Sequence, residues 1–532
     1  MPDRLRRGAL AIAVAVGAVA SVAFLMAVAR HIRYGSSDNA NALLAGHDML
    51  HGNLLLAGWR LPHNSYWLLD LPLFGVASAL FGLRDVLLAA VPAAVATAGI
   101  AAGTVVAMTG RPDRRRWWVA AAVLLLVLGL PHPYLVFFVL QGPHHMATAV
   151  VCLIAFGLLA RAGIGGGRWL AGTALLAVAA HSDPFAIGVG IAPVAAAGVV
   201  DGLRTRRLGA VAGPLAAAAG GLAGAFLLGV LLELAGGYTP LPDPPTVARW
   251  RENLGGTWRV LGALFGLSFP GRLEGGAFVA HAVGAALFAV GIAASAIRSL
   301  AGVIRPPTGN AAGAGSGRLR ERTPSPAWLD DALLFGCGAS AALFALLTDP
   351  PHQALNARYL LPVLAFGAVL TGRRAIETTA RLPLAAVAAG SLALVAAHLT
   401  TPLEIVRGPA VENPTVTVAD WLVARNLREG YGQYWVAGLT TVSSRGAVAV
   451  RPVMGVEGRL HANRQFASRR WFEGDRSFRF VVVDREKPDG VDEQAAVATF
   501  GPPVETADVG SYQVLVWDRN LSVAPDPRVA GH

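Results

Sequence analysis

The sequence predicts a polytopic α-helical membrane protein with about eleven transmembrane helices and a small C-terminal α/β domain outside the membrane. Of the 532 residues, 54% are hydrophobic and only 14% are charged, which is not the composition of a soluble globular domain. Apolar runs near the roughly 20 residues that cross the hydrocarbon core recur up to about residue 400. Polar residues and short strand-like runs follow. We therefore expect a transmembrane domain over residues 1–400 and an extracytoplasmic domain over 401–532.

Eleven apolar segments meet or approach the spanning length. They centre on residues 9–29, 85–109, 117–134, 146–161, 168–181, 184–200, 208–235, 276–299, 327–347, 358–372 and 383–400. The first follows Arg4, Arg6 and Arg7 and is longer than the roughly 7–15 apolar residues of a cleaved signal peptide, so we expect an uncleaved anchor. An odd number of spans puts the two termini on opposite sides of the membrane.

The basic residues of the loops predict the orientation. Arginines gather at residues 111–116, 204–207 and 373–374, and these loops alternate with loops that hold histidines. Because cytoplasmic loops carry the excess of arginine, we expect the N-terminus inside and the histidine loops and the C-terminal domain outside the plasma (inner) membrane. The net charge of +11 is then explained by orientation and anionic lipid headgroups, so nucleic acid is excluded as a partner and the lipid bilayer is expected.

Residues 31–83 are predicted to form an outer loop with juxtamembrane helices. The apolar run from 68 to 83 is short and is interrupted by Asp70 and Pro72. If it crossed the membrane, the arginines of 111–116 would lie outside, against the positive-inside rule.

Two further segments lie outside the predicted spans. Residues 246–265 carry apolar side chains at spacings of three and four and charged residues on the other face, which predicts an amphipathic helix on the outer leaflet. Residues 302–326 are rich in Gly, Ala, Pro, Ser and Arg and are expected to be a flexible cytoplasmic loop. Asp330 and Asp331 follow, and we interpret them as stabilising the N-terminus of the next helix.

The C-terminal region has an α/β pattern. A helix is expected over 416–428, stopped by Gly430, and another over 491–500; strands are expected at 434–437, 447–450, 478–484 and 512–518. This order predicts a partly parallel sheet. The continuous apolar run from Phe480 to Val483 predicts a strand covered on both faces.

The polar loop after the first span holds the chemically richest residues. Asp38 lies only a few residues beyond that span, and His47, Asp48 and His51 follow. Histidines four residues apart share one face of a helix, as in the His-Glu-x-x-His zinc helix. Because Asp is shorter than Glu and the sequence shows no third ligand, a divalent metal at His47 and His51 stays open beside the alternative of histidines that form hydrogen bonds in a polar cavity.

This loop resembles the GT-C superfamily of integral-membrane glycosyltransferases, which contains the protein O-mannosyltransferases and the aminoarabinose transferases. The matching positions are Asp38, Ala40, Ala45, Gly52 and Leu71-Pro72-Leu73. A second stretch, Ala357-Arg358-Tyr359-Leu-Leu-Pro362, is similar to the Arg-Tyr-x-x-Pro stretch of these enzymes, and residues 430–435 look like part of their outer domain. Asn39 stands where the family usually has a second acidic residue.

The resemblance implies a transferase that moves a sugar from a polyprenyl-phosphate-linked donor to an extracytoplasmic glycan, lipid or protein acceptor. Asp38 would be the general base, since the family's acidic residue in the first outer loop is essential. Arg358 is the preferred ligand of the leaving phosphate, with Tyr359, Arg33 and Arg60 behind it. Snorkelling to the interface is the competing interpretation of Arg358.

Further polar residues are expected on the same side of the membrane. Asp48 is a candidate second carboxylate for acceptor or metal. His144 is a candidate substrate-binding residue that could line the cavity, although we expect it and His145 first of all to satisfy helix ends. Asp70 should face the cavity or pair with Arg60, because an unpaired charge at this depth is costly.

Two other functions fit the same pattern. A transporter or flippase of lipid-linked sugars would also need a polar cavity, but transporters often show broken helices at mid-membrane in two related halves, and no internal repeat is visible in the sequence. A non-catalytic scaffold of the cell envelope is the third interpretation.

Overall fold

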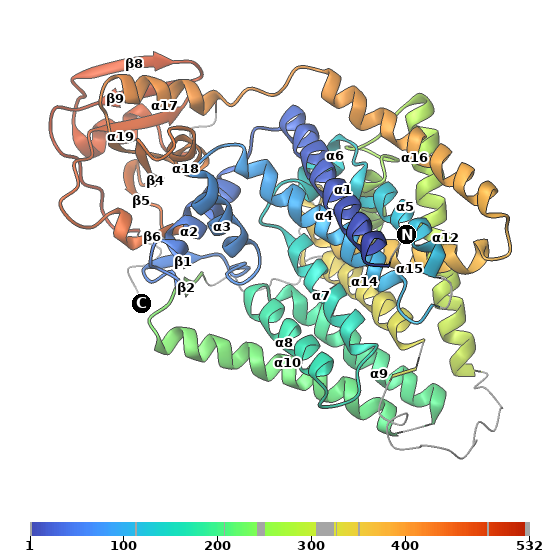
Figure 1. Cartoon of the computed structure of the whole chain (residues 1–532). Helices are drawn as coiled ribbons and strands as arrows, with labels where there is room; N and C mark the ends of the chain where they lie inside the picture. The colour runs from blue at the N-terminus through green and yellow to red at the C-terminus, as the bar shows by residue number, and fades with distance from the viewer. Residues whose placement is uncertain are drawn as a thin grey trace.

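The protein folds as a helical bundle with a β-sheet region packed at one end, as the computed structural model of the chain shows (Figure 1). The structure describes residues 3–111, 114–206, 208–241, 250–304, 324–325, 327–348, 352–486 and 489–526. Two short helices of the N-terminal third lie between the bundle and the sheet (Figure 1). This junction between bundle and sheet is where the polar residues of interest meet.

Each of the eleven predicted apolar segments is helical. The helices are α1 (Asp3–Ile32), α4 (Leu87–Ala107), α5 (Trp117–Leu124), α7 (His145–Leu159), α8 (Gly167–Ser182), α9 (Ala192–Thr205), α10 (Leu208–Leu234), α12 (Gly275–Ile304), α14 (Trp328–Leu347), α15 (Leu361–Thr379) and α16 (Leu384–Arg407). Two π-helical turns, Leu125–Gly129 and Ile187–Ile191, adjoin α5 and α9, and a 3-10 turn, Ala357–Leu360, precedes α15.

Not all of these helices are long enough to span a bilayer alone. Within the described residues, eight are long and apolar enough, or nine if the segment 117–129 and α6 (Pro133–Val139), which meet at a 96° bend, count as one broken span. The helices α7 and α8 have 15 and 16 residues, which is short of the roughly 20 that cross the hydrocarbon core. The chain is thus a multi-pass membrane protein, while the count of eleven spans stays a prediction.

The outer loop predicted over 31–83 contains two short helices and one strand, α2 (Ser37–Leu50), β1 (Trp59–Leu61) and α3 (Asp70–Phe81). With 12 residues α3 is too short to cross a membrane. The two helices cross closely because glycines meet at the contact: a Cβ on Gly46 would collide with the Leu71 carbonyl, and one on Gly75 with the backbone of Gly46.

The predicted amphipathic helix is α11 (Trp250–Leu264); the predicted residues 246–249 lie outside the described residues. Its polar residues Asn253 and Thr257 are buried, and the Asn253 amide donates to the carbonyls of Ala345 and Thr348 at 2.9 and 2.6 Å. Trp258, on the opposite side, is 73% exposed. Trp250 and Leu254 are exposed as well, whereas Val260 and Leu264 are buried. The first half of the predicted apolar stripe therefore points away from the protein, as a lipid-facing helix requires.

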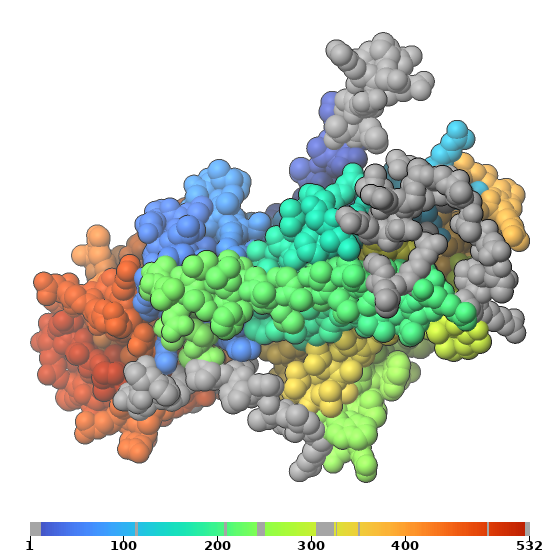
Figure 2. Space-filling model, turned by 90° about the horizontal axis from the view of Figure 1, so that it is seen from below, coloured from blue at the N-terminus to red at the C-terminus, as the bar shows by residue number. Residues whose placement is uncertain are grey.

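The helix α10 runs along one face of the bundle toward the outer loop (Figure 2). The strand β2 (Thr239–Pro240) that follows it pairs with β1, which also pairs with β6 (Ala467–Ser468). This small sheet joins three distant parts of the chain. Most of the loop predicted over 302–326 lies outside the described residues.

The C-terminal region is a six-stranded, partly parallel sheet with helices, as predicted. The strand order is β5 (Arg459–Ala462), β4 (Ala449–Val456), β3 (Glu429–Gln433), β7 (Phe480–Asp484), β9 (Tyr512–Val516) and β8 (Glu505–Val509). The central strand β3 is parallel to β4 and to β7, and the other pairs are antiparallel. The helices are α17 (Pro414–Ala424), α18 (Tyr434–Ser443) and α19 (Glu493–Phe500).

Two local predictions in this region are wrong. Residues 434–437 begin the helix α18 and are not a strand, and Gly430 lies inside β3 instead of ending a helix. Glycine is required there because a Cβ on Gly430 would collide with the Phe480 ring of the neighbouring strand. The prediction for β7 is confirmed: Val481 and Val483 enter one core cluster, and Phe480 and Val482 enter the cluster on the other face.

Asp330 and Asp331 do more than stabilise a helix N-terminus. Asp330 accepts hydrogen bonds from Arg373 and Arg374, and Asp331 accepts two from Arg204, the shorter at 2.8 Å. These side chains bind the start of α14 to the ends of α15 and α9. Arginines that we interpreted as a signal of orientation are also partners in buried ion pairs.

Candidate functional site

Asp38 is the centre of the candidate site. The Ser36 hydroxyl caps α2 by accepting from the backbone of Asn39, and this places Asp38 in the first turn, half-buried. Its Oδ1 accepts a hydrogen bond of 2.7 Å from the hydroxyl of Tyr434, the first residue of α18. Burial, and next the negative charge of Asp38, raise the pKa of Tyr434 well above its ordinary value, so the phenol keeps its proton and remains the donor.

Two guanidinium groups lie within electrostatic reach of Asp38, namely those of Arg33 and Arg358. Arg33 donates to the carbonyl of Gly35 at 3.0 Å and to the side chain of Gln141 at 3.3 Å. Arg358 is half-buried in the turn before α15, 5.6 Å from the centre of the Tyr359 ring, and its Nε has no hydrogen-bond partner. The site therefore has a carboxylate near two guanidinium groups, and the Nε of one of them, Arg358, is free to donate a hydrogen bond.

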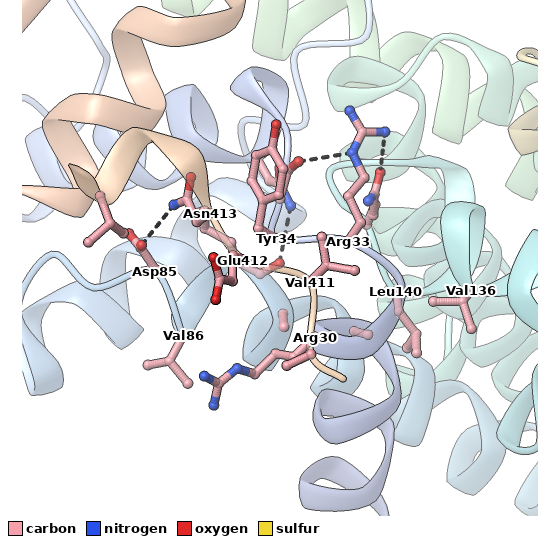
Figure 3. A pocket seen from close by; sticks show the side chains of 18 of the residues that line it. Arg30, Arg33, Tyr34, Asp85, Val86, Val136, Leu140, Val411, Glu412 and Asn413 are labelled. Atoms are coloured by element: carbon pink, nitrogen blue, oxygen red, sulfur yellow. Dashed lines mark hydrogen bonds between the residues drawn. The ribbon is translucent and has the colours of Figure 1, made fainter. Parts of the chain in front are cut away.

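A cavity of about 440 Å³ adjoins this group between the end of α1, the start of α4 and residues 410–417. Arg30 and Arg33 project into it, as Figure 3 shows, and Asp85 is bonded to Asn413 at 2.9 Å on the opposite side. Its apolar lining residues are Val86, Leu88, Ala89, Val136, Leu140, Val411 and Val416. Neither Asp38 nor Arg358 lines this cavity; Arg33 connects it to the carboxylate.

The segment 141–145 links the two arginines to the bundle. Gln141 holds Arg33, and the Nδ1 of His144 lies 3.0 Å from the carbonyl of Phe138. Burial, followed by the positive charge of Arg358, lowers the pKa of His144 to about 3. His144 is therefore neutral at physiological pH and adds no charge beside the arginines.

The next residue, His145, is fully buried and bonded to a carboxylate. Its Nδ1 lies 2.7 Å from Oδ2 of Asp183, the residue that ends α8. Its ring packs 4.5 Å from the ring of Tyr359. The bond between His145 and Asp183 thereby supports the turn that carries Arg358.

The other predicted site residues lie apart from this group. Asp48, ten residues beyond Asp38 on α2, accepts from the indole of Trp59 and from the amide of Asn53, both at 2.7 Å. Arg60 is buried in β1. Of the two alternatives for Asp70, the pairing with Arg60 is not formed, and Oδ2 of Asp70 has no partner. Asp48 therefore orders the loop before β1.

The histidine pair on α2 shows no metal-binding geometry. The rings of His47 and His51 are 3.9 Å apart, the Nδ1 of His51 is bonded to the His47 carbonyl, and His47 contacts Ser78 at 3.3 Å. Among the described residues, no group of three or more His, Cys, Asp or Glu side chains could hold a metal ion. A metal role for this pair lacks a third ligand.

Sequence reasoning missed the partners of the predicted residues. Tyr434 was noticed only as part of a similar stretch, and neither its bond to Asp38 nor the contact between Gln141 and Arg33 was expected. His145 was interpreted as satisfying a helix end, and its bond to Asp183 was not expected. The one available signal was that both are polar residues at interruptions of apolar runs on the same predicted side of the membrane.

The bundle, the outer loop with α2 and α3 and the appended sheet together define a GT-C-like fold, as the sequence predicted. The chain is similar to ArnT from Cupriavidus metallidurans in the apo state, with a TM-score of 0.52 and 14% identity over 95% of this chain and 98% of that one. The structure of ArnT bound to undecaprenyl phosphate gives a TM-score of 0.51 and 14% identity over 94% of this chain and 97% of that one. At these identities the similarity shows the fold alone.

A weaker similarity is to the oligosaccharyltransferase AglB from Archaeoglobus fulgidus in complex with an inhibitory peptide and a dolichol-phosphate. The TM-score is 0.44 at 13% identity over 88% of this chain and 69% of that one. No protein-family model and no curated protein matches the sequence.

Proposed function

We propose that the protein is a membrane glycosyltransferase that moves a sugar from a polyprenyl-phosphate donor to an extracytoplasmic acceptor, with Asp38 as the general base. The observation that carries the proposal is the position of Asp38. Its carboxylate is held by Tyr434, flanked by Arg33 and Arg358, and next to a cavity with basic and apolar walls. A lipid phosphate needs walls of both kinds.

The reaction uses these groups in one displacement. An acceptor hydroxyl attacks the anomeric carbon of the donor sugar and forms the new glycosidic bond. The bond between that carbon and the phosphate oxygen breaks, and its electron pair leaves with the polyprenyl phosphate. The hydroxyl proton passes to Asp38, whose Oδ1 is already occupied by Tyr434, so Oδ2 is the oxygen that receives it.

The departing phosphate requires positive charge. Guanidinium groups bind phosphate through two parallel hydrogen bonds, and Arg358 has an Nε without a partner. Arg33, the second guanidinium near Asp38, lines the cavity. The similarity in fold to ArnT, of which a structure bound to undecaprenyl phosphate exists, supports a lipid phosphate as the ligand of these arginines.

The site is proposed to face the outside of the plasma membrane, because the arginine-rich ends of α9 and α15 are expected in the cytoplasm. Single cysteines at Ser36 and Ser443, in a background without Cys152 and Cys337, should react with an impermeant maleimide added to intact cells. Labelling only after the cells are opened would contradict this orientation.

The function is tested by mass spectrometry of cell-envelope glycans from cells with and without the protein. We expect one glycosyl substituent to disappear and to return with the wild-type chain but not with Asp38→Asn. The matched control is Asp420→Asn, which changes an exposed carboxylate on α17 and should restore the substituent. An unchanged glycan profile in cells without the protein would overturn the proposal.

A further inference from the structure

A buried polar cluster next to the arginines contains hydrogen-bonding atoms that have no partner. It is formed by Tyr66, Asp70, His145 and Asp183, which come from the segment before α3, the start of α3, the start of α7 and the end of α8. Oδ2 of Asp70 and Nε2 of His145 are buried and unpaired, and Nε of Arg358 is unpaired beside them. Native proteins almost always satisfy such buried atoms, with a protein group, water or a ligand.

Hydrogen bonds to α7, α8 and the segment after α8 fix the cluster in place. Asp183 accepts from His145, from the hydroxyl of Thr148 and from the backbone of Phe185. The backbone of Tyr66 donates to the Ser182 carbonyl at 2.8 Å, and Tyr66 itself has a φ of 52°. A non-glycine residue in the left-handed region is strained, and such strain gathers at functional sites.

The cluster adjoins the groups proposed to bind the phosphate. The charges of Arg358, Asp70 and Asp183 all act on the hydroxyl of Tyr66. A Cβ on Gly142 would lie 3.6 Å from Oδ1 of Asp70, and the preceding residue is the Gln141 that holds Arg33. A group attached to a phosphate between the arginines therefore has this cluster as its neighbour.

The chemistry of the cluster favours an uncharged ligand with hydroxyl groups. Burial, and next the charge of Asp183, raise the pKa of Asp70 well above its usual range and so favour its protonated form, which offers one donor and one acceptor. The same two causes raise the pKa of Tyr66. The Asp70 carboxyl and the Tyr66 hydroxyl are thus favoured in their uncharged forms, beside the rings of His145 and Tyr359.

We infer that Tyr66, Asp70 and His145 form the subsite that binds the hydroxyl groups of an uncharged sugar on the lipid-phosphate donor. This inference rests on the proposed function and deepens it, because it assigns the sugar to residues distinct from Asp38 and the arginines. Asp70 and the Nε2 of His145 bind sugar hydroxyls, while Asp183 positions His145.

The test compares two kinds of lipid on the full-length protein in detergent. Binding is measured for undecaprenyl phosphate and for a panel of undecaprenyl-phosphate monosaccharides carrying glucose, mannose, galactose or arabinose. The wild type should bind at least one sugar lipid more tightly than undecaprenyl phosphate. Asp70→Leu replaces the carboxyl oxygens with methyl groups and so removes the hydrogen-bonding group. It should weaken the affinity for that sugar lipid about 10- to 100-fold, the usual effect of one buried hydrogen bond.

Undecaprenyl phosphate serves as the internal control, because Asp70→Leu should leave its affinity within about two-fold if the variant folds. Asp70→Asn keeps a carbonyl acceptor and a donor, so its affinity for the sugar lipid should fall less than that of Asp70→Leu. An equal affinity of the wild type for lipids with and without sugar, or full retention of the sugar preference in Asp70→Leu, would overturn the subsite and indicate that water fills the cluster. Failure of the wild type to bind undecaprenyl phosphate at all would instead contradict the proposed function.

Discussion

The two ends of α15 carry arginines in opposite situations. Arg358 lies in the turn before this helix, and Arg373 and Arg374 lie near its other end, roughly 25 Å away by helical rise. Arg373 and Arg374 both bond to Asp330, and Arg374 also bonds to Glu377 at 2.9 Å. Arg358 has no carboxylate partner in hydrogen-bond contact, and its Nε is unpaired.

The Arg373 end is a closed network. Besides Asp330, Arg373 donates to the carbonyls of Ala107 and Thr109 at 3.1 and 2.8 Å, which satisfies the C-terminus of α4. Glu377 is bonded to Arg111 and Arg298 as well as Arg374. The ion pairs at this end join α4, α12, α14 and α15 and fix how these helices pack.

The difference teaches how to separate structural from functional charge in this chain. Removing a paired charge at the Arg373 end takes a counter-charge from buried partners, so the cost falls on stability. The Nε of Arg358 has no protein partner, so we expect the loss of its charge to fall mainly on the proposed phosphate ligand.

The largest expected effect is that of Asp38→Asn on sugar transfer. The amide keeps the size of the side chain but cannot accept the acceptor's proton, so the transfer rate should fall about 10²- to 10⁴-fold, the usual contribution of a general base. The measurement is transfer from a radiolabelled lipid-linked donor in membranes, with thermal unfolding in detergent beside it. An unchanged rate removes Asp38 from the mechanism, and a large drop in melting temperature would place Asp38 with the structural charges.

Asp330→Ala should show the reverse pattern. It leaves Arg373 without a carboxylate and Arg374 with Glu377 alone, and breaking a buried pair in this way costs about 3–5 kcal/mol. The measurement is the free energy of unfolding in mixed micelles titrated with dodecyl sulfate. The control Asp420→Ala, at an exposed position, should cost less than about 0.5 kcal/mol. If Asp330→Ala lowered the free energy of unfolding as little as the control does, the charges at the Arg373 end of α15 would not be structural.

Arg358→Lys sharpens the comparison with an intermediate effect. A lysine keeps the charge but replaces the two-pronged guanidinium with a single point, so binding of a phosphate should weaken about ten-fold. The measurement is the affinity for undecaprenyl phosphate. Unchanged affinity and an unchanged transfer rate would support the interpretation that Arg358 only snorkels to the interface.

Tyr434→Phe should lower transfer by less than Asp38→Asn does. It removes one charge-assisted hydrogen bond, worth about 1.5–3 kcal/mol, from a carboxylate that remains in place. The measurement is kcat at saturating donor. If the loss equalled that of Asp38→Asn, Tyr434 would take part in the chemistry itself and would not merely position the carboxylate.

The smallest effect concerns pH. The pKa of His144 is lowered to about 3 in the folded protein, chiefly by burial and next by Arg358. Between its ordinary value of 6.5 and 3 the unfolded chain binds a proton that the folded chain does not, so stability falls as the pH drops through this window. His144→Asn should make the fall in melting temperature from pH 7 to pH 4 shallower than that of the wild type. Equal slopes in the two proteins would contradict the lowered pKa.

Much of the fold could be predicted because the apolar segments are local signals. All eleven became helices, and the apolar run of β7 correctly indicated a buried strand. The strand β3 was missed because two of its five residues are glycines, which have low strand propensity and are tolerated here by the contact with Phe480. Whether α7 and α8 span a membrane depends on where helices end, and periodicity is least reliable at helix ends.

The candidate site could be predicted only as a set of single residues. Asp38 and Arg358 stand out as charged side chains beside apolar runs, and the structure puts them within electrostatic reach of each other. The bonds of Tyr434 to Asp38 and of His145 to Asp183 join segments that no local pattern relates. The ion pairs of Arg204, Arg373 and Arg374 could not be predicted either. Arginines in short loops already satisfy the positive-inside rule, so nothing in the sequence indicated that they also have carboxylate partners.

The hydrogen bond between Asp38 and Tyr434 joins residues 396 positions apart in the chain. At a synthesis speed of about 5–20 residues per second, the first residue leaves the ribosome roughly 20–80 s before the second exists. Nascent and truncated chains that already sit in the bilayer thus lack the contact that completes the candidate site. If the proposed function holds, translation itself delays the moment at which the protein can use its lipid donor.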